Sequence, residues 1–295
     1  MPVANMTSIV GMHRSGTSVT AHLVHELGVS VIGEEKFLRH GNSYNAQGYW
    51  ETGELVTINN RILYHLGGDW RTISSIKYGW WQGRSLKSLK HRARNFLEGV
   101  AGSHRAWKDP RLSLTLPLWQ HIMAEMGVKT RYIVCLRNPL DVAASLMRRD
   151  HMDPATAISL WLHYTYYAIM YTQGQSRLPI LYEDLIAEDH SAVLSGLVHF
   201  LGCTTTPTPS QSVVQPDLAH GHRHPEGNVT EDDIPMSVRQ LWLQLVAWQH
   251  GTVTDNVVLE SMHTLLSVPH TVLPVNKYKL KGWASDVKMR WLEEW

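Results

Sequence analysis

Residues 7–18 read T-S-I-V-G-M-H-R-S-G-T-S, an apolar run followed by a turn between two glycines. The interval from Gly11 to Gly16 matches the pattern G-x-x-x-x-G, in which backbone N–H groups and a helix N-terminus surround an oxyanion. The lysine that follows this pattern in nucleoside-triphosphate sites is replaced by Thr17, and the cation of the loop is Arg14. Such a loop can hold one phosphate but is poorly equipped for a magnesium triphosphate. The stretch therefore predicts a strand–loop–helix site for a nucleotide with a single 5′ group.

A second candidate anion site lies further along the chain. Residues 132–136 form an apolar run of strand length, as expected of a strand buried on both faces of a parallel sheet. Arg137 stands at the carboxyl end of this run, where open α/β sheets bind their ligands. An Asn-Pro pair ends the strand, and the helical pattern after it brings Ser145 towards the anion that Arg137 would hold. Taken alone, these could also be a surface arginine and a helix serine.

Together, the two motifs resemble those of the sulfotransferase family. The S-G-T-S loop is similar to the family's 5′-phosphosulfate loop, and R-N-P-L-D-V-A-A-S is similar to its 3′-phosphate motif. The resemblance implies that 3′-phosphoadenosine 5′-phosphosulfate (PAPS) is the donor and adenosine 3′,5′-bisphosphate (PAP) the product, without a metal. The residues implied for the 5′ end are Arg14, Ser15, Gly16, Thr17 and Ser18, and those for the 3′-phosphate are Arg137 and Ser145.

Two further segments extend the resemblance, which covers residues 7–202. W-K-D-P-R-L at 107–112 is similar to a K-D-P segment of the tyrosyl-protein branch, and L-Y-E-D-L at 181–185 matches the family's strand that ends in Y-E-D-L. By this likeness, Lys108 contacts the transferring sulfuryl group and Tyr182 lies near the adenine.

Sulfuryl transfer requires in-line alignment, stabilisation of charge and removal of the acceptor proton. Arg14 and Lys108 can supply positive charge. The segment G-E-E at 33–35 resembles one in the tyrosyl-protein branch, where a glutamate is the base; spacing favours Glu35 and the motif match favours Glu34. A solvated acidic pair is the alternative reading of these glutamates. Glu51, in G-Y-W-E, and His40 are the other candidate bases.

The composition limits the partners and the compartment. The chain has 295 residues, a net charge of +1 and 18% charged residues, which gives no reason to expect a nucleic-acid partner. Its two cysteines, Cys135 and Cys203, do not suggest a disulfide framework. The first strand begins near residue 7, which leaves no room for a signal peptide, and no run of about 20 apolar residues indicates a membrane span. We expect a cytoplasmic enzyme without a membrane partner.

Strands that alternate with helical patterns predict an α/β fold of the P-loop type, with a doubly wound parallel sheet flanked by helices. We expect a PAPS-binding core over residues 1–203, and a linker with a mostly helical C-terminal extension over 204–295. The H-G-H-R-H stretch at 220–224 is expected to be a solvated loop rather than a metal site. Lys279 and Lys281 remain open as nucleotide contacts.

The acceptor is expected to be a hydroxyl of a small metabolite or a carbohydrate. Trp70, Trp80 and Trp81 could stack on a sugar or aromatic ring, or could fold onto the core. Two other classes of protein are possible. A P-loop nucleotide kinase or NTPase with a degenerate loop is disfavoured by Thr17, and a non-catalytic nucleotide-binding module is disfavoured by the retained charged groups, Arg14 and Lys108 among them.

Overall fold

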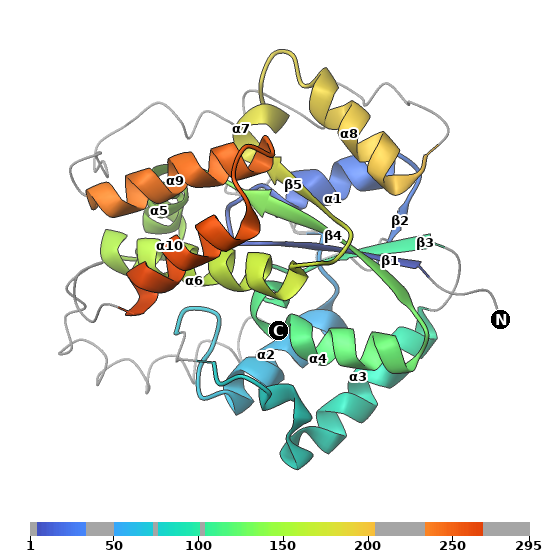
Figure 1. The fold of residues 1–295 in the computed structure, drawn as a ribbon. Coiled ribbons are helices and arrows are strands. Elements are labelled where there is room, and N and C mark those ends of the chain that lie inside the picture. The colour runs from blue at the N-terminus through green and yellow to red at the C-terminus, as the bar shows by residue number, and fades with distance from the viewer. Residues whose placement is uncertain (1–4, 34–49, 73–75, 101–103, 204–233, 268–295) are drawn as a thin grey trace.

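The computed structural model describes residues 5–33, 50–72, 76–100, 104–203 and 234–267. At its centre lies a five-stranded sheet of order β2-β3-β1-β4-β5, in which every neighbouring pair of strands is parallel (Figure 1). The strands are β1 (Asn5–Gly11), β2 (Ser30–Val31), β3 (His104–Lys108), β4 (Lys129–Leu136) and β5 (Arg177–Leu181). The predicted α/β class with a parallel sheet is confirmed.

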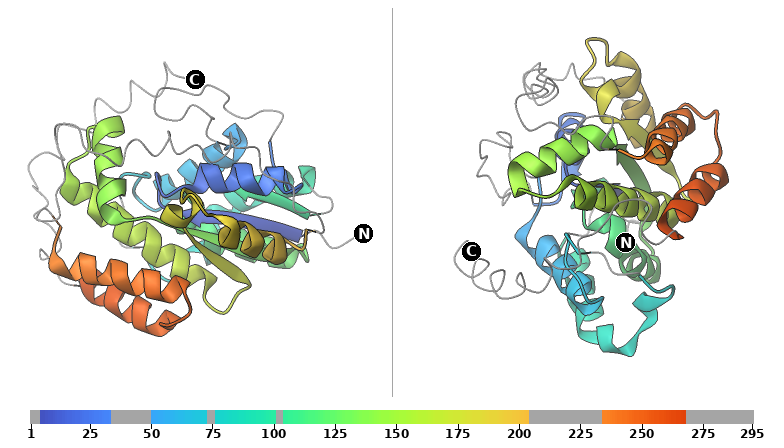
Figure 2. Two further views of the ribbon diagram at one scale, coloured as in Figure 1. Left: turned by 90° about the horizontal axis from the view of Figure 1, so that it is seen from above. Right: turned by 90° about the vertical axis from the view of Figure 1, so that its left-hand side faces the viewer.

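Helices cover both faces of the sheet (Figure 2). One hydrophobic cluster joins one face to α1 (Thr17–Glu26) and α8 (Ser191–Leu201). A larger cluster joins the other face to the remaining long helices. These are α2 (Gly53–His65), α3 (Lys87–Gly99), α4 (Leu112–Glu125), α5 (Pro139–Asp150), α6 (Pro154–Thr172), α9 (Met236–Gln249) and α10 (Asp255–Ser267). Short helical turns occur at α7 (Tyr182–Leu185), η1 (Trp80–Gln82) and η2 (Arg84–Leu86).

Local sequence signals explain the ends of the central elements. The last five residues of β4 are all buried, as its uninterrupted apolar run predicted. Pro139 occupies the first turn of α5, where its missing N–H is no loss, and the Asn138 side chain accepts the Leu140 N–H at 2.9 Å. Asp153 caps α6 in the same way, ahead of Pro154. These caps fix where the chain leaves β4 and enters the helices beside the candidate site.

The helix predicted after Pro235 is α9, and α10 follows it as a second helix that had not been individually predicted. α9 contacts β5, and α10 contacts α6. The expected division of the chain after residue 203 stays a prediction. Among the described helices, none is long and apolar enough to cross a membrane.

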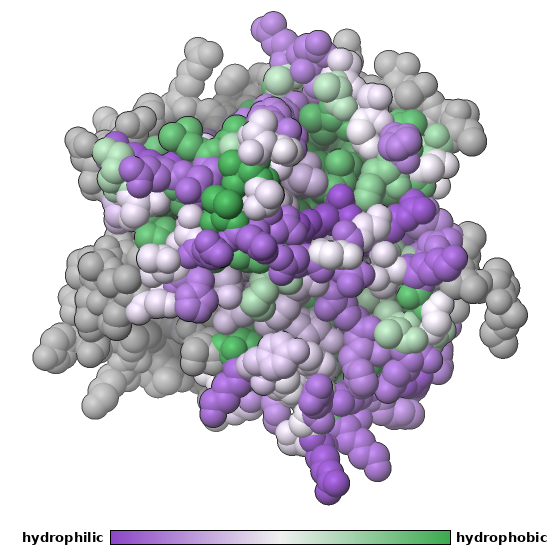
Figure 3. All heavy atoms as spheres, viewed as in Figure 1, coloured by the Kyte–Doolittle hydropathy of each residue, from purple (hydrophilic) through white to green (hydrophobic). Residues whose placement is uncertain are grey.

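The basic side chains of α3 lie on the surface. Figure 3 shows mainly hydrophilic side chains over the lower part of the molecule, where α3 lies. Arg92 bonds Glu54 at 2.7 Å, and Arg94 pairs with Glu125. Both arginines of this helix are thus matched by neighbouring carboxylates at the surface.

Candidate functional site

The loop after β1 has a backbone that requires glycine at two places. Gly11 has φ 145°, and a Cβ atom there would lie 2.5 Å from the carbonyl oxygen of Cys135. Gly16 has φ 82°, and a Cβ atom there would lie 2.5 Å from Cδ2 of Tyr182. Gly16 is also the N-cap of α1, and no side chain caps that helix. The N-terminus of α1 therefore presents its first-turn N–H groups and the positive end of its dipole to an anion.

The two predicted anion motifs meet in space. Arg14 has the left-handed value φ 69°, and its Nε donates to Oγ of Ser145, 2.7 Å away. Nη1 of Arg137 donates to the backbone carbonyl of Arg14 at 2.8 Å. The loop after β1 and the loop after β4 are adjacent because β1 and β4 are neighbours in the sheet. The structure thus brings Arg14, Arg137 and Ser145 together at the carboxyl ends of these strands.

Tyr182 connects both motifs. The guanidinium of Arg137 lies over its ring, 4.2 Å from the ring centre, and the same ring is the one that leaves no space for a side chain at Gly16. Nε1 of Trp161 donates to the Arg137 carbonyl at 3.0 Å, and the N–H of Asn138 donates to Glu183 at 2.8 Å. The orientation of Arg137 is therefore set by groups from α6 and α7.

Lys108 ends β3 and forms a buried ion pair. Its Nζ lies 2.6 Å from Oε1 of Glu51, and their side chains are 2% and 10% exposed. Oε2 of Glu51 lies 3.7 Å from Nη1 of Arg111, which also bonds Asp109 at 2.9 Å. Burial opposes the charge of Arg111, but Asp109 and Glu51 outweigh it and raise the pKa of this guanidinium. Asp109 in turn accepts from Nδ2 of Asn59 at 2.8 Å.

Glu51 is held against Lys108 because the residues on either side of Glu51 are anchored. Trp50 has φ 53°, and its ring stacks on that of His22 in α1 with centres 4.7 Å apart. Thr52 caps α2 by accepting the Leu55 N–H at 3.2 Å. Sequence reasoning held Glu51 as a candidate base, and the structure places it against Lys108.

His13, which sequence reasoning missed, lies buried in the loop itself. It is 8% exposed, and its ring centre lies 4.5 Å from that of Trp70 and 5.6 Å from that of Tyr164. Its Nε2 is buried and has no hydrogen-bond partner in the structure described. Burial, reinforced by the charges of neighbouring cations, lowers the pKa of His13 well below its usual range. Its place between Gly11 and Gly16, next to Arg14, was the available sequence signal.

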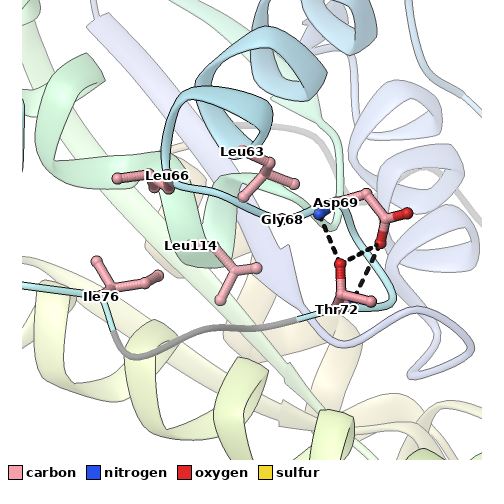
Figure 4. Close-up of a pocket in the computed structure, with 7 residues that line it drawn as sticks. All are labelled: Leu63, Leu66, Gly68, Asp69, Thr72, Ile76 and Leu114. Atoms are coloured by element: carbon pink, nitrogen blue, oxygen red, sulfur yellow. Dashed lines mark hydrogen bonds between the residues drawn. The ribbon is translucent and has the colours of Figure 1, made fainter. Parts of the chain in front are cut away.

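Trp70 is held over His13 by a hydrogen-bonded turn. The N–H of Thr72 donates to Oδ1 of Asp69 at 2.9 Å, and the N–H of Asp69 donates to Oγ1 of Thr72 at 2.9 Å (Figure 4). A Cβ atom at Gly68 would lie 2.1 Å from the Thr72 carbonyl oxygen, so this turn requires glycine there. The cavity beside it has a volume of ≈ 10 Å³, room for one water at most.

The burial of Trp70, Trp80 and Trp81 distinguishes stacking on a ligand from packing onto the core. Trp70 is 6% exposed and packed inward, while Trp80 and Trp81 are partly buried against the main core. The alternative in which these side chains fold onto the core is therefore the correct one for Trp70. A sugar-stacking role for Trp70 would require the ring to leave His13.

Several predicted site residues lie outside the described residues. These are Glu34, Glu35, His40, the histidine stretch at 220–224, Lys279 and Lys281. In the ranges that the structure does describe, no three His, Cys, Asp or Glu side chains are grouped to hold a metal ion.

The fold and this site define an α/β protein with a glycine-bracketed loop and an uncapped helix N-terminus at the carboxyl ends of its central strands. Residues 5–216 match the family model described as "Sulfotransferase domain", so the chain belongs to the sulfotransferase domain family. A solved structure, the sulfotransferase domain from the Synechococcus PCC 7002 olefin synthase, is similar with 18% identity and a TM-score of 0.40, over 90% of this chain and 96% of that one. None of the curated proteins matches this chain.

Proposed function

We propose that this sulfotransferase uses PAPS as donor and transfers the sulfuryl group to a hydroxyl of a small molecule or glycan. The observation that best supports this is the hydrogen bond from Arg137 to the carbonyl of Arg14, 2.8 Å long. It joins two anion motifs into one surface, and PAPS is a nucleotide with anionic groups at two separate positions. A triphosphate site would need only one extended anion cradle and a metal.

The residues present fit such a donor. The uncapped N-terminus of α1, with the left-handed backbone of Gly16 at its N-cap, suits a 5′ phosphosulfate on Arg14, Ser15, Gly16, Thr17 and Ser18. Arg137 and Ser145 would hold the 3′-phosphate, since Arg is suited to bidentate contacts with phosphate. Tyr182, on which Arg137 already lies, would pack near the adenine.

The chain's own groups supply the remaining chemistry. The bond between sulfur and the 5′-phosphate oxygen breaks while the acceptor oxygen bonds to sulfur, and the hydroxyl proton passes to a base. Arg14 and Lys108 would stabilise the charge on the sulfuryl oxygens. Glu51 would orient Lys108, because its carboxylate already faces both Lys108 and Arg111. A carboxylate, Glu34 or Glu35, stays the predicted base.

A binding experiment followed by a turnover assay tests this function. Calorimetry should show that PAP binds much more tightly than AMP, and that ATP with magnesium binds weakly. Release of PAP from PAPS should then depend on an added hydroxyl acceptor drawn from a panel of phenols, alcohols and glycans. Preference for ATP–magnesium over PAP would refute the proposal, and tight PAP binding without turnover on any acceptor would favour a non-catalytic module.

We also propose that the enzyme works in the cytoplasm without nucleic-acid or membrane partners. The support is its near-neutral net charge of +1 and its two cysteines, both free, with Cys135 buried.

A further inference from the structure

His13 has a buried imidazole nitrogen without a hydrogen-bond partner in the described part of the chain, and it lies in the loop that we propose holds an anion. Its Nε2 lacks a hydrogen-bond partner among the described residues, and its ring is packed between Trp70 and Tyr164. Buried polar atoms in folded proteins nearly always have a partner, so an exception needs a reason. A ligand oxygen in the loop would provide that partner.

The charge around His13 is mainly positive, and it comes from several elements. Arg14 lies in its own loop, Lys108 ends β3, Arg111 precedes α4 and Arg149 lies in α5; all four lower the pKa of the imidazole, after burial, which is the largest cause. The ring thus stays neutral while the loop holds no anion.

Three of these four cations pair with a carboxylate, while Arg14 donates to the hydroxyl of Ser145. Glu51 pairs with Lys108, Asp109 with Arg111, and Asp150 with Arg149. Tyr164 of α6, whose pKa burial raises, lies against the His13 ring, and Arg71 and Asp69 belong to the turn that carries Trp70. No described acid bonds the imidazole itself, so an incoming anion would bring a negative charge into direct contact with it.

We propose that His13 is a further ligand of the donor's anionic 5′ end and that it binds this anion in the protonated form. The proposal rests on the proposed function, because it requires PAPS or PAP in the loop. Nε2–H would donate to an anionic oxygen, and the negative charge of the nucleotide would offset the four cations. One proton would pass from solvent to the imidazole as the nucleotide binds.

The sign of the pH dependence follows from this coupling. His13 would have a higher pKa in the complex than in the free protein, so binding takes up a proton. The contribution of His13 to affinity would then be absent at high pH and would grow as the pH falls below the pKa of the complex. Below the pKa of His13 in the free protein, this contribution would reach its maximum. The maximum is a tenfold gain in affinity for each pH unit that separates the pKa of His13 in the complex from that in the free protein.

Calorimetry with PAP measures this proton directly. Titrations at pH 6 in two buffers with different ionisation enthalpies give the number of protons taken up per PAP bound. The PAP phosphates also exchange protons, so the wild type is compared with His13→Asn, which keeps a side-chain donor but cannot titrate. The matched control is His163→Asn in α6, a histidine whose pKa is lowered by burial rather than by the loop cations.

We expect wild type and His163→Asn to take up the same number of protons, and His13→Asn to take up measurably fewer. The affinity ratio of wild type to His13→Asn should also increase as the pH falls. Equal proton uptake by wild type and His13→Asn would overturn the inference while leaving the proposed function intact. Failure of every variant, wild type included, to bind PAP would instead remove the proposed function.

A second measurement covers the case in which His13→Asn does not fold. Wild-type protein labelled with ¹⁵N in its histidine rings should show one ring that is neutral at pH 6 without PAP and protonated with PAP. If no histidine changes its protonation state on saturation with PAP, the inference is wrong.

Discussion

Removing the charge of Glu51 should destabilise the protein by a large and calculable amount. The substitution Glu51→Gln keeps the shape of the side chain but leaves the ammonium of Lys108 buried, 2% exposed, without its counter-charge. Breaking a buried ion pair from one side costs about 3–5 kcal/mol, because the remaining charge stays desolvated. With an unfolding entropy of about 2 cal/mol/K per residue, this cost lowers the melting temperature of a 295-residue chain by about 5–8 °C.

Differential scanning calorimetry measures this shift, and the chain offers a matched control. Glu54 also bonds a basic side chain, Arg92, at 2.7 Å, but the two side chains are 43% and 34% exposed. Glu54→Gln should therefore cost below about 1 kcal/mol, or less than about 2 °C. The double variant Glu51→Gln/Lys108→Met should lose less than the sum of its single variants, since no unpaired charge remains.

Ligand binding sharpens the same test. In Glu51→Gln, an anion in the loop would be the new counter-charge for Lys108, so saturating PAP should raise its melting temperature more than that of the wild type. A melting temperature of Glu51→Gln within about 2 °C of wild type would refute the buried-pair reasoning. If that stable variant were also inactive while still binding PAP, Glu51 would be the base and not the residue that positions Lys108.

Three further predictions concern the donor, the loop and the base. Arg137→Ala should weaken PAP binding at least tenfold, since a charge-assisted hydrogen bond contributes about 1.5 kcal/mol or more, and should hardly change AMP binding; equal losses for both nucleotides in calorimetry would contradict a 3′-phosphate role. Gly16→Ala should abolish PAP binding and destabilise the fold by well over 1 kcal/mol, because a Cβ atom would meet Tyr182 at 2.5 Å. The control is Gly28→Ala, since Gly28 has φ 86° but nothing within 4 Å of an added Cβ atom. This variant should cost only about 1 kcal/mol in thermal unfolding. Similar losses of stability in both glycine variants would show that the destabilisation comes from backbone strain and not from the contact with Tyr182. Of Glu34→Gln and Glu35→Gln, we expect one to lose about 10²–10⁴-fold in turnover while binding PAP normally. Two fully active variants would exclude both glutamates as the base and leave Glu51 as the candidate carboxylate.

The parts of the fold that the sequence predicts are those with a strong local signal. The loop between Gly11 and Gly16 carries its spacing in the chain, and the strand before Arg137 is an apolar run with an Asn-Pro end. Both were predicted as observed. Their contact, from Arg137 to Arg14, spans 123 residues and depends on β1 and β4 being neighbours. The alternation of strands and helices indicates a parallel sheet but does not by itself specify the strand order.

The site residues that the sequence did not resolve depend on contacts between distant segments. Lys108 and Glu51 are 57 positions apart, and their pairing follows from how the chain returns past Thr52 to begin α2. His13 stood in the quoted loop, yet nothing local shows that Trp70 and Tyr164 enclose it. The burial that makes its imidazole unusual comes from a glycine turn and a helix that follow much later in the chain.

The place of Tyr182 directly after β5 has a consequence for how the site forms during synthesis. Among the described strands, β5 lies at the edge of the sheet, pairs only with β4 and comes last in the sequence. When the loop after β1 and the segment around Arg137 have left the ribosome, Tyr182 has not yet done so. Both segments then lack the ring that they contact in the folded protein. The proposed nucleotide site would then be completed only when β5 adds to the sheet. Nucleotide binding by nascent chains of increasing length would report the chain length at which β5 joins the sheet.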